Sequence, residues 1–168
     1  MSTATSVRTA TTSQLDAKLL ARTIEEGYGS GAWHGPDLKA ALSDVTPELA
    51  FWRPSRGRHN IAEIALHHAY FVRSVRGQLS GGAPEPFVLE GEDWFELSES
   101  GPLTWAQILD VVESQQRQLA AAVSDLGAPG RRRQTPLDVE PFPIVLGITC
   151  HAVYHAGQVQ LIKRLRAS

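Results

Sequence analysis

Two histidines four residues apart near the C-terminus are the side chains in this sequence best suited to chemistry. His151 and His155 lie in a segment with helical apolar spacing, and residues i and i+4 project from the same face of a helix. Two imidazoles on one face can bind a single metal ion. A catalytic zinc-type site usually has three protein ligands and one open position, so the pair needs a third ligand from another part of the chain.

Two adjacent histidines, His67 and His68, are the candidates for that third ligand. In the helical segment that contains them, His68 lies in the middle of the apolar stripe and His67 at its edge. Neighbouring residues point about 100° apart on a helix, so one helix does not easily offer both rings to one ion. Position within the stripe does not decide between them, because a ligand can lie at the seam between two helices. Both candidates therefore stay open on this ground.

Two further polar residues share helical faces with these histidines. Glu63 lies four residues before His67 and is a candidate general base. Its spacing from Asn60 also matches a capping box, which explains the residue more simply. Gln158 is one turn beyond His155 and could orient that ring by a hydrogen bond.

Other residues near the candidate site have plainer interpretations. Cys150 is expected to be a small core residue, and Tyr154 a packing residue whose hydroxyl needs a partner. The segment 81–101 is rich in Gly, Pro, acids and aromatics, and is predicted to be a long connection. Its residues 92–94 could form a lid, although a solvated loop that packs one tryptophan is the simpler account.

Four long segments with helical spacing must position these side chains. They cover about residues 13–28, 60–79, 104–126 and 143–166, with short helices at 37–43 and after Thr46. Capping boxes are predicted at the start of the second and third long segments. No strand signal is strong. The pattern predicts an all-α fold, a four-helix bundle with short extra helices and long connecting loops.

Composition narrows the class of protein. The 168 residues suit one domain over 13–168, with a disordered N-terminal tail over 1–12. A net charge of −2 argues against a nucleic-acid partner. No apolar run approaches the ~18 residues of a membrane span. The single cysteine, Cys150, excludes an intrachain disulfide and a cysteine-rich zinc site, which fits a cytoplasmic protein.

Two motifs, taken together, resemble a known family. The run NIAEIALH at 60–67, followed by Ala69-Tyr70, is similar to the second helix of DinB-like proteins. The run HAVYHAGQ at 151–158 resembles their last-helix signature, a histidine, three residues, then His-x-Gly-Gln. The connector Trp52-Arg53-Pro54 also looks like a family feature just upstream of the second helix. Each motif alone is weak, but the pair in this order is fairly specific.

The resemblance spans roughly Leu15 to Arg166 and implies a DinB-like bundle with a three-histidine metal site. It assigns His67, His151 and His155 as ligands of a divalent metal ion, commonly zinc or nickel. It leaves His68 at a position where the family more often has an apolar residue. That departure keeps His68 as the rival ligand.

The resemblance implies a metal-dependent enzyme, either a hydrolase or a transferase that uses a low-molecular-weight thiol, acting on a small molecule. Three neutral imidazoles leave positive charge on a divalent ion, which can lower the pKa of a bound water towards ~7 or stabilise a thiolate. A homodimer is also expected from the resemblance. The alternative is a metal-stabilised bundle that acts as a non-catalytic binding or interaction module. A carboxylate di-iron bundle is poorly supported, because such sites use Glu-x-x-His and the chain contains none.

Overall fold

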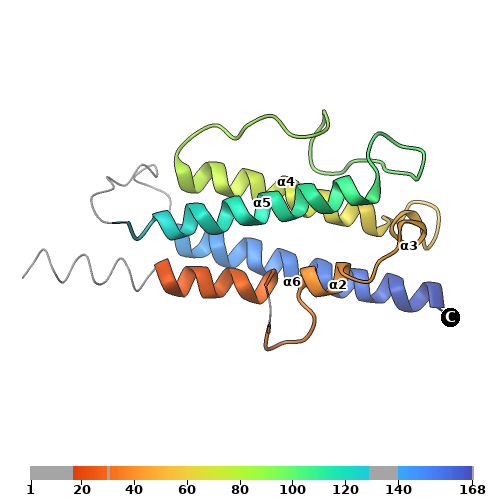
Figure 1. Ribbon diagram of the computed structural model, residues 1–168, viewed down its shortest axis with the longest axis horizontal. Coiled ribbons are helices and arrows are strands. Elements are labelled where there is room, and N and C mark those ends of the chain that lie inside the picture. Colours follow the sequence, from red (N-terminus) through yellow and green to blue (C-terminus); the bar gives the residue numbers. More distant parts are fainter. Residues whose placement is uncertain (1–16, 30, 129–139, 168) are drawn as a thin grey trace, which may run out of the picture.

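The computed structural model describes residues 17–29, 31–128 and 140–167. Within these ranges every regular element is a helix (Figure 1), which confirms the predicted all-α class. The tail predicted over residues 1–12 lies outside the described residues. Across the described ranges, none of the helices combines the length and the apolarity that a membrane span requires.

The longer helices of the described ranges run alongside one another (Figure 1). Residues 17–27 are helical, and the described elements that follow are α2 Leu38–Leu42, α3 Pro47–Phe51, α4 Ile61–Ser80, α5 Trp105–Asp125 and α6 Pro141–Ala167. The last helix begins two residues earlier than predicted. The N–H groups of a first helical turn have no partner within the helix, so a proline, which has no N–H, loses no hydrogen bond there. Pro141 and Pro143 can therefore both be accommodated in the first turn.

Local sequence signals fix where α4 and α5 begin. The Asn60 side chain accepts a hydrogen bond from the Glu63 backbone amide, and the Glu63 carboxylate accepts one from the Asn60 backbone amide. Thr104 and Gln107 make the same reciprocal pair at the start of α5. Both predicted capping boxes are thereby confirmed. Each satisfies two backbone N–H groups that the first turn would leave unpaired, and so fixes the residue at which the helix begins.

Helix α4 packs against both α5 and α6 and places its histidines between two apolar clusters. One cluster lies toward the start of α4, with Ile61 and Leu66 against α2, α5 and the second half of α6. The other lies toward its end, with Val72 and Leu79 against residues of the 17–27 helix, α5 and the first half of α6. Side chains of α4 and α6 that fall between the clusters therefore meet inside the bundle.

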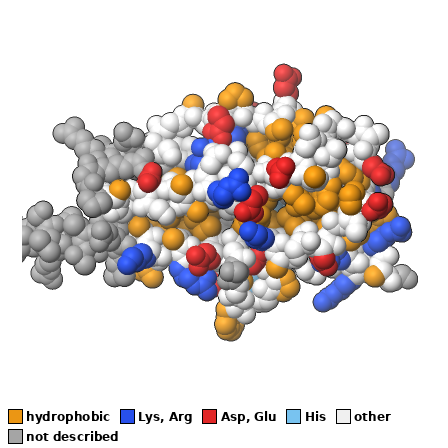
Figure 2. Space-filling model, viewed as in Figure 1, with side chains coloured by type: hydrophobic (Ala, Val, Ile, Leu, Met, Phe, Trp, Pro, Cys, Tyr) orange, Lys and Arg blue, Asp and Glu red, His pale blue; other side chains and the backbone are white. Residues whose placement is uncertain are grey.

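The structure departs from two predictions for α6. Cys150 is exposed rather than part of the core. Tyr154 is 64% exposed, although its ring contacts that of His155 and its hydroxyl has a hydrogen-bond partner. Both lie outside the buried face of α6, which His155 and its apolar neighbours occupy. Tyr154 lies at the rim of that face, beside His155. On the face drawn in Figure 2, acidic and basic side chains of the described residues are interspersed, in keeping with the net charge of −2.

Candidate metal centre

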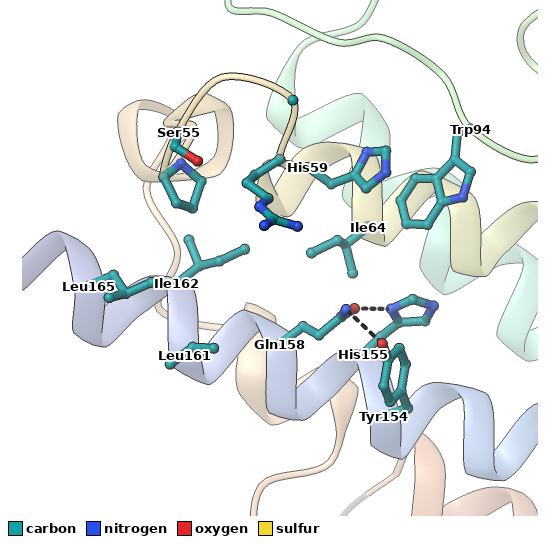
Figure 3. A pocket seen from close by; sticks show the side chains of 13 residues that line it. Ser55, His59, Ile64, Trp94, Tyr154, His155, Gln158, Leu161, Ile162 and Leu165 are labelled. Atoms are coloured by element: carbon teal, nitrogen blue, oxygen red, sulfur yellow. Dashed lines mark hydrogen bonds between the residues drawn. The ribbon is translucent and has the colours of Figure 1, made fainter.

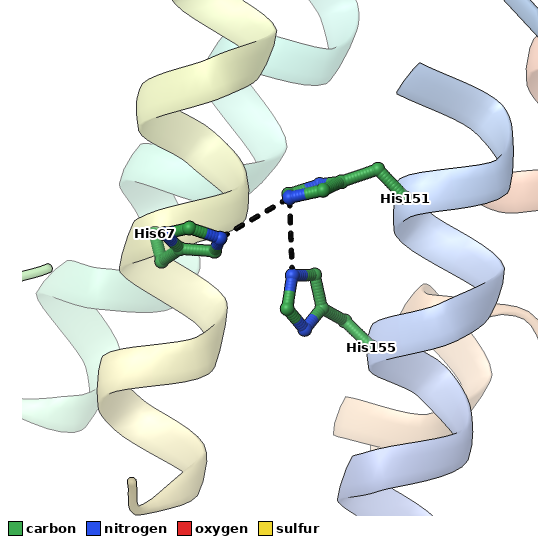
Figure 4. Close-up of side chains that lie close together, drawn as sticks. All are labelled: His67, His151 and His155. Atoms are coloured by element: carbon green, nitrogen blue, oxygen red, sulfur yellow. Dashed lines mark hydrogen bonds between the residues drawn. The ribbon is translucent and has the colours of Figure 1, made fainter. Parts of the chain in front are cut away.

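Three histidines from two neighbouring helices converge on one point inside the bundle (Figure 4). The Nε2 atom of His151 lies 3.1 Å from Nε2 of His67 and 3.1 Å from Nε2 of His155. One ring nitrogen of each of the three lies within 4.8 Å of the others. Tetrahedral zinc with Zn–N bonds of ~2.0–2.1 Å holds its nitrogens roughly 3.3 Å apart, so this cluster has the dimensions of a metal site.

Hydrogen bonds on the far side of two rings hold those rings in place. Nδ1 of His67 lies 3.1 Å from the backbone oxygen of Asp93 and 2.9 Å from its carboxylate. Nδ1 of His155 lies 2.6 Å from Oε1 of Gln158, where sequence spacing placed a possible orienting residue. Carbonyl and carboxylate oxygens can only accept, so each Nδ1 donates its proton. The Nε2 lone pairs of His67 and His155 are therefore left for a cation.

His68 points away from this centre. It is fully buried, with its Nδ1 3.1 Å from Nδ1 of His151 and its Nε2 2.6 Å from the amide nitrogen of Gln116. The structure thus brings His67 into the cluster and places His68 behind His151. Sequence reasoning missed Gln116, although its spacing from Val112 and Leu119 puts a polar side chain on the buried face of α5.

The long connection between α4 and α5 covers His67. Trp94 stacks on the His67 ring at a centroid distance of 3.8 Å and on His59 at 3.6 Å. Asp93 adopts a positive φ of 67°, a conformation that aspartate tolerates better than most residues, and this turn directs both its oxygens to His67. The sequence suggested a lid here. It carried no signal that Asp93 would reach α4, because the contact depends on the path of the whole loop.

Asp93 gives a direct test of this arrangement. Asp93→Gly removes the carboxylate but suits the positive φ and keeps the backbone carbonyl. We expect zinc affinity to fall by roughly tenfold, the lower end of the effect of losing a group that orients a metal ligand. Competition with a chromophoric chelator measures it. Glu92→Gly, one residue earlier and exposed, is the control, and equal affinities for the two variants would contradict the assignment.

Glu63, the candidate base, is held in a different network. Its carboxylate is 1% exposed and pairs with Arg53, whose Nη1 lies 3.0 Å from Oε2. The His59 ring and the Leu97 amide contact the same carboxylate at 3.0 and 3.1 Å. These partners, with the Asn60 cap, tie two loops to the start of α4. The geometry gives Glu63 a structural role and does not bring it to the three histidines.

Burial keeps the clustered imidazoles neutral. It lowers the pKa of His151 and of His155 to about 4, with repulsion from neighbouring histidines as a further cause for His151. Burial also lowers the pKa of His67, against the opposing effect of Asp93. At neutral pH the three rings therefore keep the lone pairs that metal binding requires, and neutral imidazole is a donor suited to zinc and nickel.

Acidification is expected to destabilise the metal-free protein. An ordinary histidine titrates near 6.5, whereas His151 and His155 in the folded chain titrate near 4. Between these values the unfolded chain binds more protons, so the free energy of unfolding falls as the pH drops from about 6.5 to about 4. For His155 alone the full loss is on the order of 3 kcal/mol. Urea unfolding at several pH values measures it, and a constant midpoint over this range would contradict it.

A cavity of about 660 Å³ opens beside the centre (Figure 3). His155 and Trp94 form part of its wall, and the lining continues along α6 through Gln158 and Ile162 to Leu165. The amide nitrogen of Gln158 donates to the Tyr154 hydroxyl at 3.2 Å. The candidate centre is therefore reachable by a small molecule from one side of the bundle.

The all-α fold and the three convergent histidines define a helical protein with a candidate histidine metal site. A family model described as the DinB superfamily matches residues 32–159, so the chain belongs to the DinB superfamily. This confirms the resemblance found in the two motifs. No curated protein and no solved structure matches the chain.

Proposed function

We propose that this protein is a metal-dependent enzyme in which His67, His151 and His155 hold one divalent ion, zinc or nickel. The observation that carries the proposal is the meeting of three neutral imidazoles, one of which, His155, also forms part of the wall of an open cavity. A structural zinc site is normally closed by four protein ligands, whereas a catalytic one leaves a position open. Among the described residues, the three histidines form the only group of this kind.

The reaction is either a hydrolysis or a transfer that uses a low-molecular-weight thiol. A divalent ion bound here would supply positive charge that favours the deprotonated form of a bound water or thiol. Trp94 covers His67 and shields that side of the centre from water. The Tyr154 hydroxyl accepts from Gln158 and can donate its own proton toward a molecule in the cavity.

A non-catalytic binding module is the second candidate. It is favoured by the part of the cavity lining that the structure describes, in which no Asp or Glu is present to act as a general acid or base. In that case the ion stabilises the bundle and the cavity serves binding alone.

A comparison of turnover with metal content separates the two candidates. The zinc- and nickel-loaded protein is assayed with activated esters and amides, and with an alkyl electrophile plus a low-molecular-weight thiol. The enzyme proposal expects turnover that requires the metal, disappears in His155→Ala and is reduced in Tyr154→Phe. Stoichiometric metal with no turnover in either assay, and a melting temperature that falls on chelation, would favour the module.

A further inference from the structure

The cavity beside the histidines has an apolar wall that runs along one side of α6. Leu161, Ile162 and Leu165 form it, and Ile64 of α4 faces them (Figure 3). Leu161 and Leu165 are 57% and 49% exposed. Large apolar side chains grouped at the surface usually mark a binding site. At 1.5 Å per residue, this wall extends roughly 15 Å from His155 to Leu165.

The same cavity carries positive charge. Arg58 and His59 line it, and none of the described residues in its lining is an Asp or Glu. Three neutral imidazoles leave the charge of a divalent ion uncompensated, so the ion would add to the positive potential from Arg58. A cavity with low-dielectric walls and one sign of charge favours a ligand of the opposite sign.

We propose that this cavity binds a small molecule with an apolar chain and an anionic group. The inference rests on the metal site proposed above. The polar head of the molecule meets the histidine centre, its chain lies over Leu161, Ile162 and Leu165, and its anionic group pairs with Arg58. Alkyl carboxylates that carry a second, metal-binding polar group share this chemistry.

Alkyl hydroxamates test the apolar wall, because the hydroxamate head binds zinc and the chain can be lengthened. Zinc-loaded protein is titrated with a series from acetohydroxamate to decanohydroxamate. Affinity should rise roughly two- to fourfold for each methylene that becomes buried, and level off once the chain passes Leu165. Leu161→Gln and Leu165→Gln should flatten the rise. Leu19→Gln, a 60% exposed leucine of the 17–27 helix, should leave it unchanged.

The anionic group is tested by comparing octanohydroxamate with the monohydroxamate of suberic acid, which ends in a carboxylate. Wild type should prefer the carboxylate form, and Arg58→Gln should remove that preference. Arg53 donates to the backbone oxygen of Arg58 and not to its side chain, so the variant keeps this contact. Arg56→Gln, which lines the neighbouring cavity, is the control.

Zinc uptake, measured first, distinguishes failure of the metal site from failure of the ligand proposal. A protein that takes up no zinc refutes the metal site itself. A protein that binds zinc but shows a flat chain-length series overturns only the ligand proposal. A dimer that Leu161→Gln and Leu165→Gln dissociate, together with a flat series, would also overturn it by showing that a second copy covers these leucines.

A separate observation concerns the hydrogen bonds behind His151. Gln116 presents its amide nitrogen to His68 at 2.6 Å, while its buried Oε1 has no hydrogen-bond partner among the described residues. His68 in turn meets Nδ1 of His151 at 3.1 Å. The three side chains form a chain in which each ring nitrogen must either donate or accept, so one proton position sets all the others.

The direction of this chain decides whether His151 can bind a metal. If the Gln116 nitrogen donates to His68, then His68 donates to Nδ1 of His151, and the His151 proton lies on Nε2, toward the centre. If the Gln116 oxygen accepts instead, His68 carries its proton on Nε2 and accepts at Nδ1 from His151. The His151 proton then lies on Nδ1, and its Nε2 lone pair is free. We infer that a half-turn of the Gln116 amide accompanies metal binding, and that Gln116 and His68 are positioning residues for His151.

Two substitutions of Gln116 distinguish this role from simple packing. Gln116→Leu removes the acceptor and should weaken zinc binding by about 10- to 100-fold. Gln116→Glu can only accept and should bind zinc at least as tightly as wild type. Gln115→Leu, the neighbouring residue that contacts Arg76 and Glu85 instead, is the control. Folded Gln116→Glu protein that binds zinc as weakly as Gln116→Leu would overturn the inference.

Nitrogen NMR of the zinc-loaded protein gives a second readout that packing would not change. The inference expects the proton of His68 on Nε2 and that of His151 on Nδ1. The opposite tautomer of His68 would overturn it.

Discussion

Replacing His151 with alanine is expected to weaken zinc binding by about a hundred- to a thousandfold, because zinc-binding free energies of ~10–16 kcal/mol divide among three or four ligands. His151 is the most sensitive position in the cluster, since its Nε2 lies 3.1 Å from the Nε2 atoms of both His67 and His155. Its loss leaves two rings on different helices with no nitrogen between them. Competition with a chelator of known affinity measures the change.

His34→Ala is the matched control for this variant. His34 lies in a loop, and its ring contacts the backbone oxygen of Glu26. Zinc affinity should stay at the wild-type value. If His151→Ala and His34→Ala bound zinc equally well, the three-histidine centre would be refuted.

Replacing Arg53 with alanine is expected to produce the largest loss of stability. Arg53 pairs with the Glu63 carboxylate, which is 1% exposed, and the hydrogen bonds from Arg53, Leu97 and His59 lower the pKa of this carboxyl against the effect of its burial. Without Arg53 a buried charge loses its main partner, which costs about 3 kcal/mol. For a chain of this size, Tm should fall by roughly 6 to 12 °C. Thermal unfolding of the metal-free protein measures it.

Two further variants sharpen this test. Adding Glu63→Gln to Arg53→Ala removes the uncompensated charge and should restore part of the lost stability. Arg22→Ala breaks an exposed pair with Glu26 and should cost less than ~0.5 kcal/mol. An Arg53→Ala protein no less stable than Arg22→Ala would show that Glu63 does not depend on its buried pair.

The helices and part of the candidate site could be predicted because their signals are local. The capping pairs at Asn60 and Thr104 lie three residues from their partners, and His151 and His155 lie four apart on one helix. The choice between His67 and His68 could not be predicted from helical spacing, because it depends on how α4 and α6 rotate as they pack. Only the family resemblance assigned His67.

Contacts between residues far apart in the chain could not be predicted from the sequence. Asp93 reaches His67 across 26 residues, and Gln116 reaches His68 across 48. The first contact depends on the path of the connection between α4 and α5, and the second on the register of α5 against α4. No short sequence pattern encodes either feature. The exposed positions of Cys150 and Tyr154 were misjudged for a related reason, since α6 is apolar on several sides and its spacing alone does not reveal the buried one.

Zinc retention tests the central claim most directly. The purified protein is stripped of metal, incubated with excess zinc, dialysed and analysed for zinc per chain. The three-histidine centre predicts one zinc per chain in wild type and none in a folded variant with His67, His151 and His155 all changed to alanine. Wild type that retains no zinc, or a triple variant that retains as much as wild type, would contradict it.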